Sequence, residues 1–194
     1  GKKIKLPQPQ QVLAQERNIT EEAFPGDIVG LFDPGIYLIG DTLSEEGSFE
    51  FEKIPMFPPE HFARVTNVNT AKYKQFQKGI NQLAEEGTIQ IYRTFVDKME
   101  DIILGVVGKL QFEVFEHRLM AEYGVKISLY HLPYQFARWI TSDSSLDLAK
   151  LHSMKSLCVK DIEGRLAVHF ENEYTLRWLQ DKNPGVKFEN TPES

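Results

Sequence analysis

Hydrophobic residues in positions 1–56 form short runs separated by turn-forming sequences, and no helical period of three to four residues connects them. Pro25-Gly26 and Asp33-Pro34-Gly35 are such turn sequences, because proline fixes φ and glycine accepts positive φ. The runs are Ile4 with Leu6, Val12–Ala14, Ile28–Phe32, Ile36–Ile39 and Phe49–Phe51. This pattern predicts short β-strands of the kind that build a small β-barrel.

The pattern changes after the adjacent prolines Pro58-Pro59, which cannot continue the interior of a strand or helix. Residues 60–132 alternate between apolar strand-like runs and two amphipathic helices, which end at Gly87 and Gly124. Strands are predicted over 62–68, 89–95, 102–107 and 125–132, and helices follow the first and third of them. This βαββαβ order is that of a ferredoxin-like unit.

The same order recurs in residues 133–194. Strands are predicted over 136–141, 157–162, 165–170 and 186–189, with a short helix over 145–154 and a second helix capped by Asn172. The predicted fold class is therefore α+β: a partial β-barrel in residues 1–56, followed by a domain over 60–194 that holds two ferredoxin-like βαββαβ units, 60–132 and 133–194.

Composition limits the partners. The formal net charge is −6, and residues 57–194 hold 17 basic and 18 acidic residues, so an overall basic footprint for RNA is absent and any RNA contact must be local. The single cysteine, Cys158, suits a reducing compartment. No apolar run is long enough to span a membrane. We therefore expect a cytoplasmic protein without a membrane partner.

No pattern of catalytic or metal-binding residues is present. The sequence Gly105-Val106-Val107-Gly108-Lys109-Leu110 imitates a phosphate loop, but Ile103 stands where the first glycine belongs and Leu110 replaces the magnesium-binding hydroxyl. We interpret it as a strand-to-helix turn. The five histidines and Cys158 lack the spacing of a metal site. We therefore predict no catalytic, cofactor or metal residue in this chain and no enzymatic activity of its own.

Basic residues are the remaining candidates for function. Lys74 and Lys78 lie one helical turn apart, with Lys72 nearby, and such a stripe can contact phosphates or simply solubilise the helix. Arg138 and Trp139 are neighbours on a strand, so they face opposite sides of the sheet. The predicted contact residues are Lys72, Lys74, Lys78, Arg138, Lys155, Lys160 and Arg165.

Two sets of segments carry a family resemblance. Phe24–Leu31 with Gly40–Leu43 resembles the second domain of translational GTPases. A further set resembles the bacterial peptide chain release factor 3 family over almost the whole chain: Gly1–Leu6, Ala14–Arg17, Phe32–Ile36, Gln82–Gly87, Gly105–Val114 and Arg118–Tyr123. The elongation factor G family is similar in its third domain, but it needs about 200 residues more after that domain, by the usual domain size.

The resemblance implies a function. Members are GTPases that bind the terminating ribosome, mainly its small subunit through rRNA and protein, and promote dissociation of the stop-codon-reading release factors. GTP or GDP and magnesium bind to a G domain, whose phosphate loop, Asn-Lys-x-Asp signature and switch regions are absent from this chain. The resemblance therefore implies the ribosome-binding C-terminal part of a GTPase, which partners the G domain of the same polypeptide, binds no GTP alone and leaves strand edges unpaired in residues 1–56.

Two alternatives stay open on sequence grounds. One is a fragment of another translational GTPase, such as elongation factor G. The other is a free-standing ferredoxin-like enzyme that handles phosphate compounds, for which the Gly105–Lys109 turn is the candidate anion-binding loop. A phosphate-ester hydrolysis assay distinguishes this enzyme from a binding module.

Overall fold

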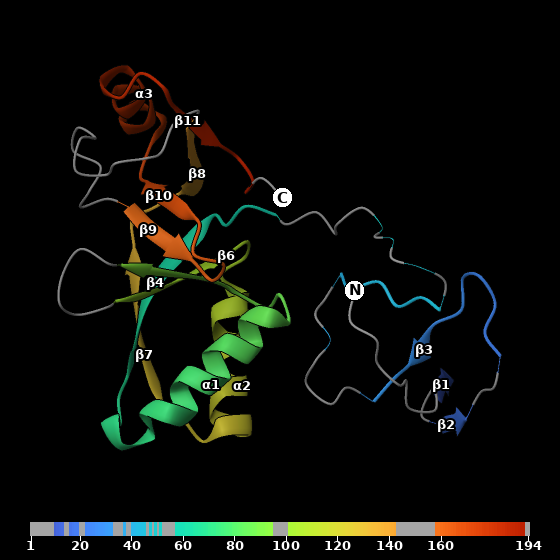
Figure 1. Ribbon diagram of the computed structural model, residues 1–194. Helices are drawn as coiled ribbons and strands as arrows, with labels where there is room; N and C mark the ends of the chain where they lie inside the picture. Colours follow the sequence, from blue (N-terminus) through green and yellow to red (C-terminus); the bar gives the residue numbers. More distant parts are fainter. Residues whose placement is uncertain are drawn as a thin grey trace. The chain divides into compact units, whose positions relative to one another are not determined.

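The structure is a computed structural model, and it describes residues 10–13, 16–19, 22–32, 37, 40–45, 47, 49, 51, 57–94, 101–142 and 158–192. The chain divides into two compact units, Gly1–Ile54 and Pro55–Ser194 (Figure 1).

The first unit contains a three-stranded antiparallel sheet of order β2-β1-β3. Its strands are β1 (Gln10–Leu13), β2 (Glu16–Ile19) and β3 (Val29–Gly30). The predicted turn at Pro25-Gly26 is confirmed: Gly26 has a φ of 100°, and the Asp27 amide donates to the Phe24 carbonyl over 2.9 Å. Strand β2 was not predicted, because its sequence Glu-Arg-Asn-Ile has no apolar alternation. Phe49 and Phe51 lie outside any strand.

The second unit is built on one antiparallel sheet of order β11-β8-β10-β9-β5-β6-β4-β7. Its strands are β4 (His61–Asn67), β5 (Gln90–Thr94), β6 (Ile102–Val106), β7 (Ile127–Leu132), β8 (Phe136–Ser142), β9 (Cys158–Asp161), β10 (Leu166–Phe170) and β11 (Val186–Glu189). All eight strands predicted for residues 60–194 are present. The predicted strand at Ile4 and Leu6, most of that at 36–39, and the predicted helix over 145–154 lie outside the described residues.

The described residues of this unit also form four helical segments: η1 (Thr70–Lys72), α1 (Tyr73–Glu85), α2 (Leu110–Tyr123) and α3 (Glu173–Lys182). The predicted helix ends at Gly87 and Gly124 and the predicted cap at Asn172 are confirmed. The Asn69 and Asn172 side chains accept hydrogen bonds from the amides of Ala71 and Thr175, as N-caps do. Gly124 ends α2 in the left-handed region, at a φ of 64°, and its amide donates to Met120.

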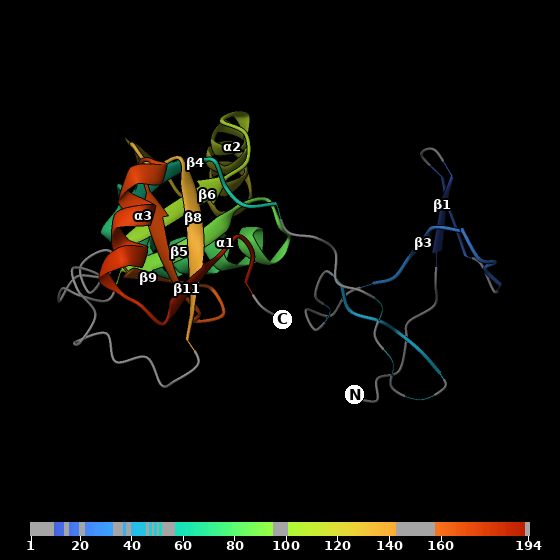
Figure 2. The same cartoon turned by 90° about the horizontal axis from the view of Figure 1, so that it is seen from above.

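Helices α1 and α2 pack together and cover one face of strands β4–β7 (Figures 1 and 2). Their apolar stripes, with Phe76, Ile80 and Leu83 on α1 and Phe115 and Leu119 on α2, are fully or almost fully buried. Helix α3 covers strands β8 and β10 in the same way. Each helix therefore forms because its sequence places an apolar stripe against the sheet, as an amphipathic period requires.

The uncovered faces of the two sheet halves pack on each other. Phe62, Tyr92 and Ile103 from β4, β5 and β6 form one cluster with Trp139 and Ala167 from β8 and β10. Since β4 and β10 are separated by three strands in the sheet order, the sheet must curl to bring them together. The strands of residues 61–132 and those of residues 136–189 therefore share one continuous sheet, joined by the β5–β9 pairing of Arg93 with Lys160.

Candidate functional site

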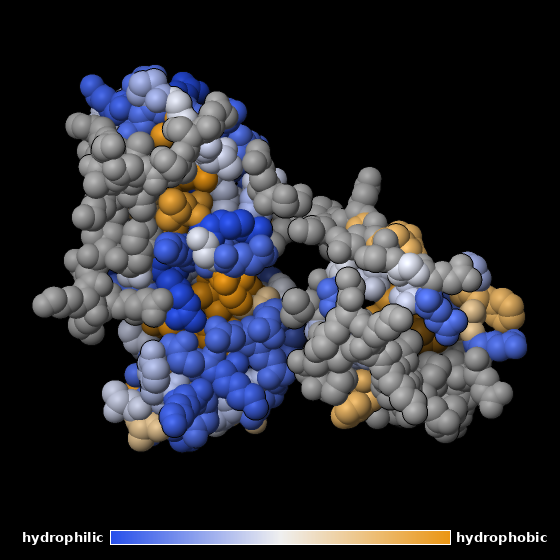
Figure 3. Space-filling model, in the orientation of Figure 1, coloured by the Kyte–Doolittle hydropathy of each residue, from blue (hydrophilic) through white to orange (hydrophobic). Residues whose placement is uncertain are grey.

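Lys74 and Lys78 lie exposed on α1, where the surface over the helix is largely hydrophilic (Figure 3). Lys72 differs from them because it is half-buried and its Nζ donates a hydrogen bond to the Gly124 carbonyl. This bond ties the start of α1 to the end of α2. Of the three predicted lysines, Lys74 and Lys78 offer their ammonium groups to solvent, whereas Lys72 has a structural partner.

Arg138 on β8 is held by three contacts. Its Nη1 donates to the Ala137 carbonyl over 2.8 Å, its guanidinium carbon lies 4.4 Å from the centroid of the Phe136 ring, and Nη2 is 3.9 Å from a Glu173 carboxylate oxygen. Its side chain is only 16% exposed, and burial lowers the pKa of the guanidinium, partly offset by Glu173. The neighbouring Trp139 faces the other side of the sheet and is in the core. Arg138 therefore joins β8 to the first turn of α3.

Arg165 closes the β9–β10 hairpin, whose turn at Glu163-Gly164 lies between the predicted strands 157–162 and 165–170 and has a Gly164 φ of 82°. Its Nε donates to Asp161 Oδ2 over 2.7 Å, and its Nη1 lies 2.8 Å from Glu163. The buried Asp161 carboxylate also accepts from Trp139 Nε1 over 2.9 Å and from the amides of Glu163 and Arg165. These bonds satisfy a buried charge, so the role of Arg165 in this structure is to stabilise the hairpin.

Lys160 is exposed on β9, and Lys155 lies outside the described residues. The structure thus distributes the six described candidates over η1, α1, β8, β9 and the β9–β10 hairpin.

The turn that imitates a phosphate loop is a strand-to-helix connection, as interpreted from the sequence. The amides of Val107 and Gly108 both donate to Gln111 Oε1 over 2.9 Å, so a side chain of the same turn already satisfies them. Gly105 lies in β6, where a Cβ atom would be 2.9 Å from both Pro59 Cβ and Tyr92 Cε2. Close packing therefore explains Gly105.

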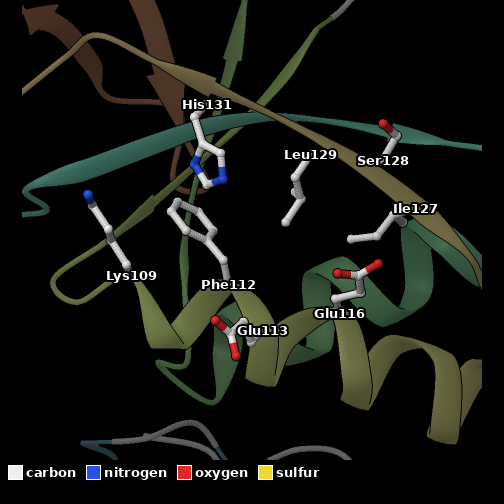
Figure 4. A pocket seen from close by; sticks show the side chains of 8 residues that line it. All are labelled: Lys109, Phe112, Glu113, Glu116, Ile127, Ser128, Leu129 and His131. Atoms are coloured by element: carbon white, nitrogen blue, oxygen red, sulfur yellow. The ribbon is translucent and has the colours of Figure 1, made fainter.

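A groove of about 490 Å³ lies between α2 and β7 (Figure 4). It is lined by Lys109, Phe112, Glu113, Glu116, Ile127, Ser128, Leu129 and His131, and is called the α2–β7 groove below. Phe112 and Ile127 are buried and form its apolar floor, whereas the exposed carboxylates of Glu113 and Glu116 line the helix side. The His131 ring lies against Phe112, with centroids 5.3 Å apart.

A second hollow of about 270 Å³ adjoins this groove and shares Lys109 and His131 with it. Its further lining includes His61 and Tyr134. The shared end is therefore basic, and the far end beside Glu116 is acidic. The sequence pattern showed only that these histidines lack the spacing of a metal site, and it did not predict the groove. Two sequence features could have indicated the groove. The last strand of the βαββαβ order is expected at a sheet edge beside the preceding helix. Glu113 and Glu116 are three residues apart, so they lie on one face of that helix.

Among the described residues, no group of three or more histidine, cysteine or acidic side chains is placed to hold a metal ion. No helix in this part of the chain is long and apolar enough to cross a membrane.

Comparison with known proteins identifies the family to which the chain is similar. The model of the class II release factor RF3, C-terminal domain, matches residues 51–180, and that of elongation factor G domain 2 matches residues 1–46. Peptide chain release factor 3 of Symbiobacterium thermophilum is 47% identical over 194 residues, covering 100% of this chain and 37% of the relative. Those of Microcystis aeruginosa and Gloeobacter violaceus are each 44% identical over 189 residues, covering 96% and 97% of the chain and 34% and 36% of the relatives.

The chain thus spans about a third of the length of these curated relatives. The resemblance inferred from the sequence is confirmed over its whole length, and the order of the two matched domains is the expected one. On this basis the chain belongs to the class II release factor family, that of peptide chain release factor 3.

Proposed function

We propose that this chain is the ribosome-binding C-terminal part of a release factor that uses GTP to promote dissociation of stop-codon-reading release factors after termination. The observation that carries this proposal is the 47% identity to a peptide chain release factor 3 over all 194 residues. In this proposal GTP or GDP and magnesium bind to a G domain of the same polypeptide. This chain has no active site of its own and works in the cytoplasm, mainly against rRNA and protein of the small subunit.

The proposal includes the architecture. Residues 1–56 would be the later strands of a β-barrel, which the elongation factor G domain 2 match and the three-stranded sheet support. Residues 60–132 and 133–194 would be two ferredoxin-like units. The orders β5-β6-β4-β7 and β9-β10-β8-β11 support this, because in each the first strand lies between the third and the fourth, as the split βαβ arrangement requires.

The basic residues divide by their surroundings. Lys74, Lys78 and Lys160 are exposed, and we assign to them the contacts with rRNA phosphates. Lys155 keeps that role as a sequence prediction. Lys72, Arg138 and Arg165 would position the elements that carry these contacts, since each is bonded to a neighbouring element or to its own hairpin.

A chimera tests the function. This chain replaces the matching 194 residues of the Symbiobacterium thermophilum relative, and the displacement of a fluorescent stop-codon-reading release factor from terminated ribosomes is followed with and without GTP. We expect GTP-dependent displacement close to that of the unaltered relative. If the chimera is folded, binds GTP through its own G domain and still fails to displace the release factor, the proposal is wrong.

A further inference from the structure

Strand β7 has an open edge. It pairs with β4 on one side, and no described strand pairs with its other side. The Val68 amide donates to the Lys126 carbonyl over 3.1 Å, which makes these opposite residues a hydrogen-bonded pair. Because such pairs alternate along an antiparallel ladder, the N–H and C=O groups of Ile127, Leu129 and His131 point away from β4. Within the described part of the chain, the backbone donors and acceptors of these three residues therefore have no strand to pair with.

The α2–β7 groove runs beside this open edge. The side chains of Ile127, Leu129 and His131 face α2 and help to line the groove, so its floor and the free backbone groups belong to the same residues. An extended peptide can add to a sheet where a strand edge lies next to an apolar groove lined by a helix. Backbone hydrogen bonds then provide affinity, and side-chain pockets provide selectivity. An unprotected edge of this kind is otherwise a liability for aggregation.

We propose that the α2–β7 groove binds an extended, basic segment of a partner protein, which adds to β7 as a further strand. In an added strand, alternate side chains point to the same face, so every second residue would face α2. There, Glu113 and Glu116 present two exposed carboxylates, and lysine or arginine side chains complement them. The Lys109 ammonium at the other end of the groove repels a lysine and so places the basic side chains toward Glu116 and Ser128.

This inference deepens the proposed function, on which the identity of the partner rests: a protein that lies on RNA carries an excess of lysine and arginine. The chemistry of the groove can be tested without a ribosome. If the chimera fails, the peptide can therefore still bind to the groove. If the peptide does not bind, the chain can still bind the ribosome through other surfaces.

The test uses the isotopically labelled 194-residue chain and the peptide acetyl-Val-Lys-Val-Lys-Val-amide, followed by nuclear magnetic resonance. We expect shift changes confined to α2 and β7, and slower hydrogen exchange of the Ile127, Leu129 and His131 amides. The opposite sheet edge, β11, is the internal control. Equal protection of β11 amides would mean unspecific strand addition and would overturn the proposal. N-methylation of the peptide amides that face β7 should abolish binding, whereas N-methylation of the remaining amides should not.

Charge variants test the selection of a basic segment. The double variant E113K/E116K should bind the peptide about tenfold more weakly or worse, because both attractive charges are reversed. The matched control E85K/D181K changes two exposed carboxylates on α1 and α3, and about 0.15 M salt screens its remote charges, so it should bind as the original chain does. Equal weakening by the two double variants would overturn the proposal. So would a dimer by sedimentation equilibrium that E113K/E116K dissociates, since the groove would then belong to a second copy.

Discussion

The His169 imidazole lies edge-on to the Tyr92 ring, with centroids 4.4 Å apart and planes at 88°. Its centroid is also 4.5 Å from that of Phe62 and 5.3 Å from that of Tyr134. The side chain is buried, and neither ring nitrogen has a hydrogen-bond partner in the described part of the chain. Burial without a partner lowers the pKa of His169 to about 3. A neutral imidazole therefore sits where β10 meets β4 and β5.

This arrangement predicts a loss of stability in mild acid. The unfolded chain takes up a proton on His169 as the pH falls through about 6.5, whereas the folded chain does not until about 3. The contribution to stability is thus complete above about pH 6.5 and is lost as the pH falls below it. At pH 5 the loss is about 2 kcal/mol, from the linkage of proton binding to unfolding. Urea unfolding at several pH values measures it.

The variant His169→Phe isolates this contribution from those of the carboxylates. Phenylalanine keeps an aromatic ring but cannot take up a proton, so the variant should lose less stability between pH 7.5 and pH 5 than the original chain, by about 2 kcal/mol. A difference between the two chains that does not change with pH would show that His169 titrates normally in the folded state.

Asp161 should be the costliest carboxylate to neutralise in the second unit. The Asp161 carboxylate accepts from Trp139 Nε1 and Arg165 Nε on one oxygen and from two backbone amides on the other. Asp161→Asn replaces one of these acceptor oxygens by an NH2 group, which would face two donors in a buried site. We expect the free energy of unfolding to fall by about 3 kcal/mol. Glu163→Gln removes the exposed partner of the same arginine and should cost less than about 1 kcal/mol. Comparable losses for the two variants would mean that burial of Asp161 is not what matters.

Local signals explain why the elements of residues 60–194 could be predicted. Each helix shows an apolar stripe, an asparagine cap or a terminal glycine, and the apolar strands are bounded by turn residues, so neighbouring residues decide these elements. Strand β2 lacks such local signals, because Glu16–Ile19 is mostly polar. It is a strand only through its pairing with β1.

Contacts between residues that are distant in the sequence could not be predicted from local sequence patterns. The β5–β9 pairing, which joins the strands of residues 61–132 to those of residues 136–189, and the packing of Phe62 against His169 depend on how the whole sheet curls. For the same reason Lys72, Arg138 and Arg165 looked like free cations, although their partners Gly124, Glu173 and Asp161 hold them. The α2–β7 groove was missed because its walls carry ordinary residues, and only their arrangement along a sheet edge makes them noticeable.

Gly105 and Gly108, both in the loop-like sequence, should respond differently to alanine. At Gly105 a Cβ would press on Pro59 and the Tyr92 ring at 2.9 Å, and both neighbours are rigid, so Gly105→Ala should destabilise by about 1–3 kcal/mol. At Gly108 nothing lies within 4 Å of the added atom, and Gly108→Ala should change stability by less than about 1 kcal/mol. Thermal and urea unfolding of the two variants measure this, and a harmless Gly105→Ala would contradict the packing described.

The exposed pair on α1 gives the sharpest test of the proposed rRNA contact. The double variant K74E/K78E should leave the unfolding curve unchanged, since neither residue is buried. It should weaken cosedimentation of the 194-residue chain with ribosomes and reduce the slope of affinity against salt by about 1–2, because each lost phosphate contact releases fewer counterions. The control K126E/K182E reverses the same number of exposed lysines outside α1 and should retain most of the affinity and the original slope. If both double variants lose affinity equally, overall charge rather than the α1 surface governs binding.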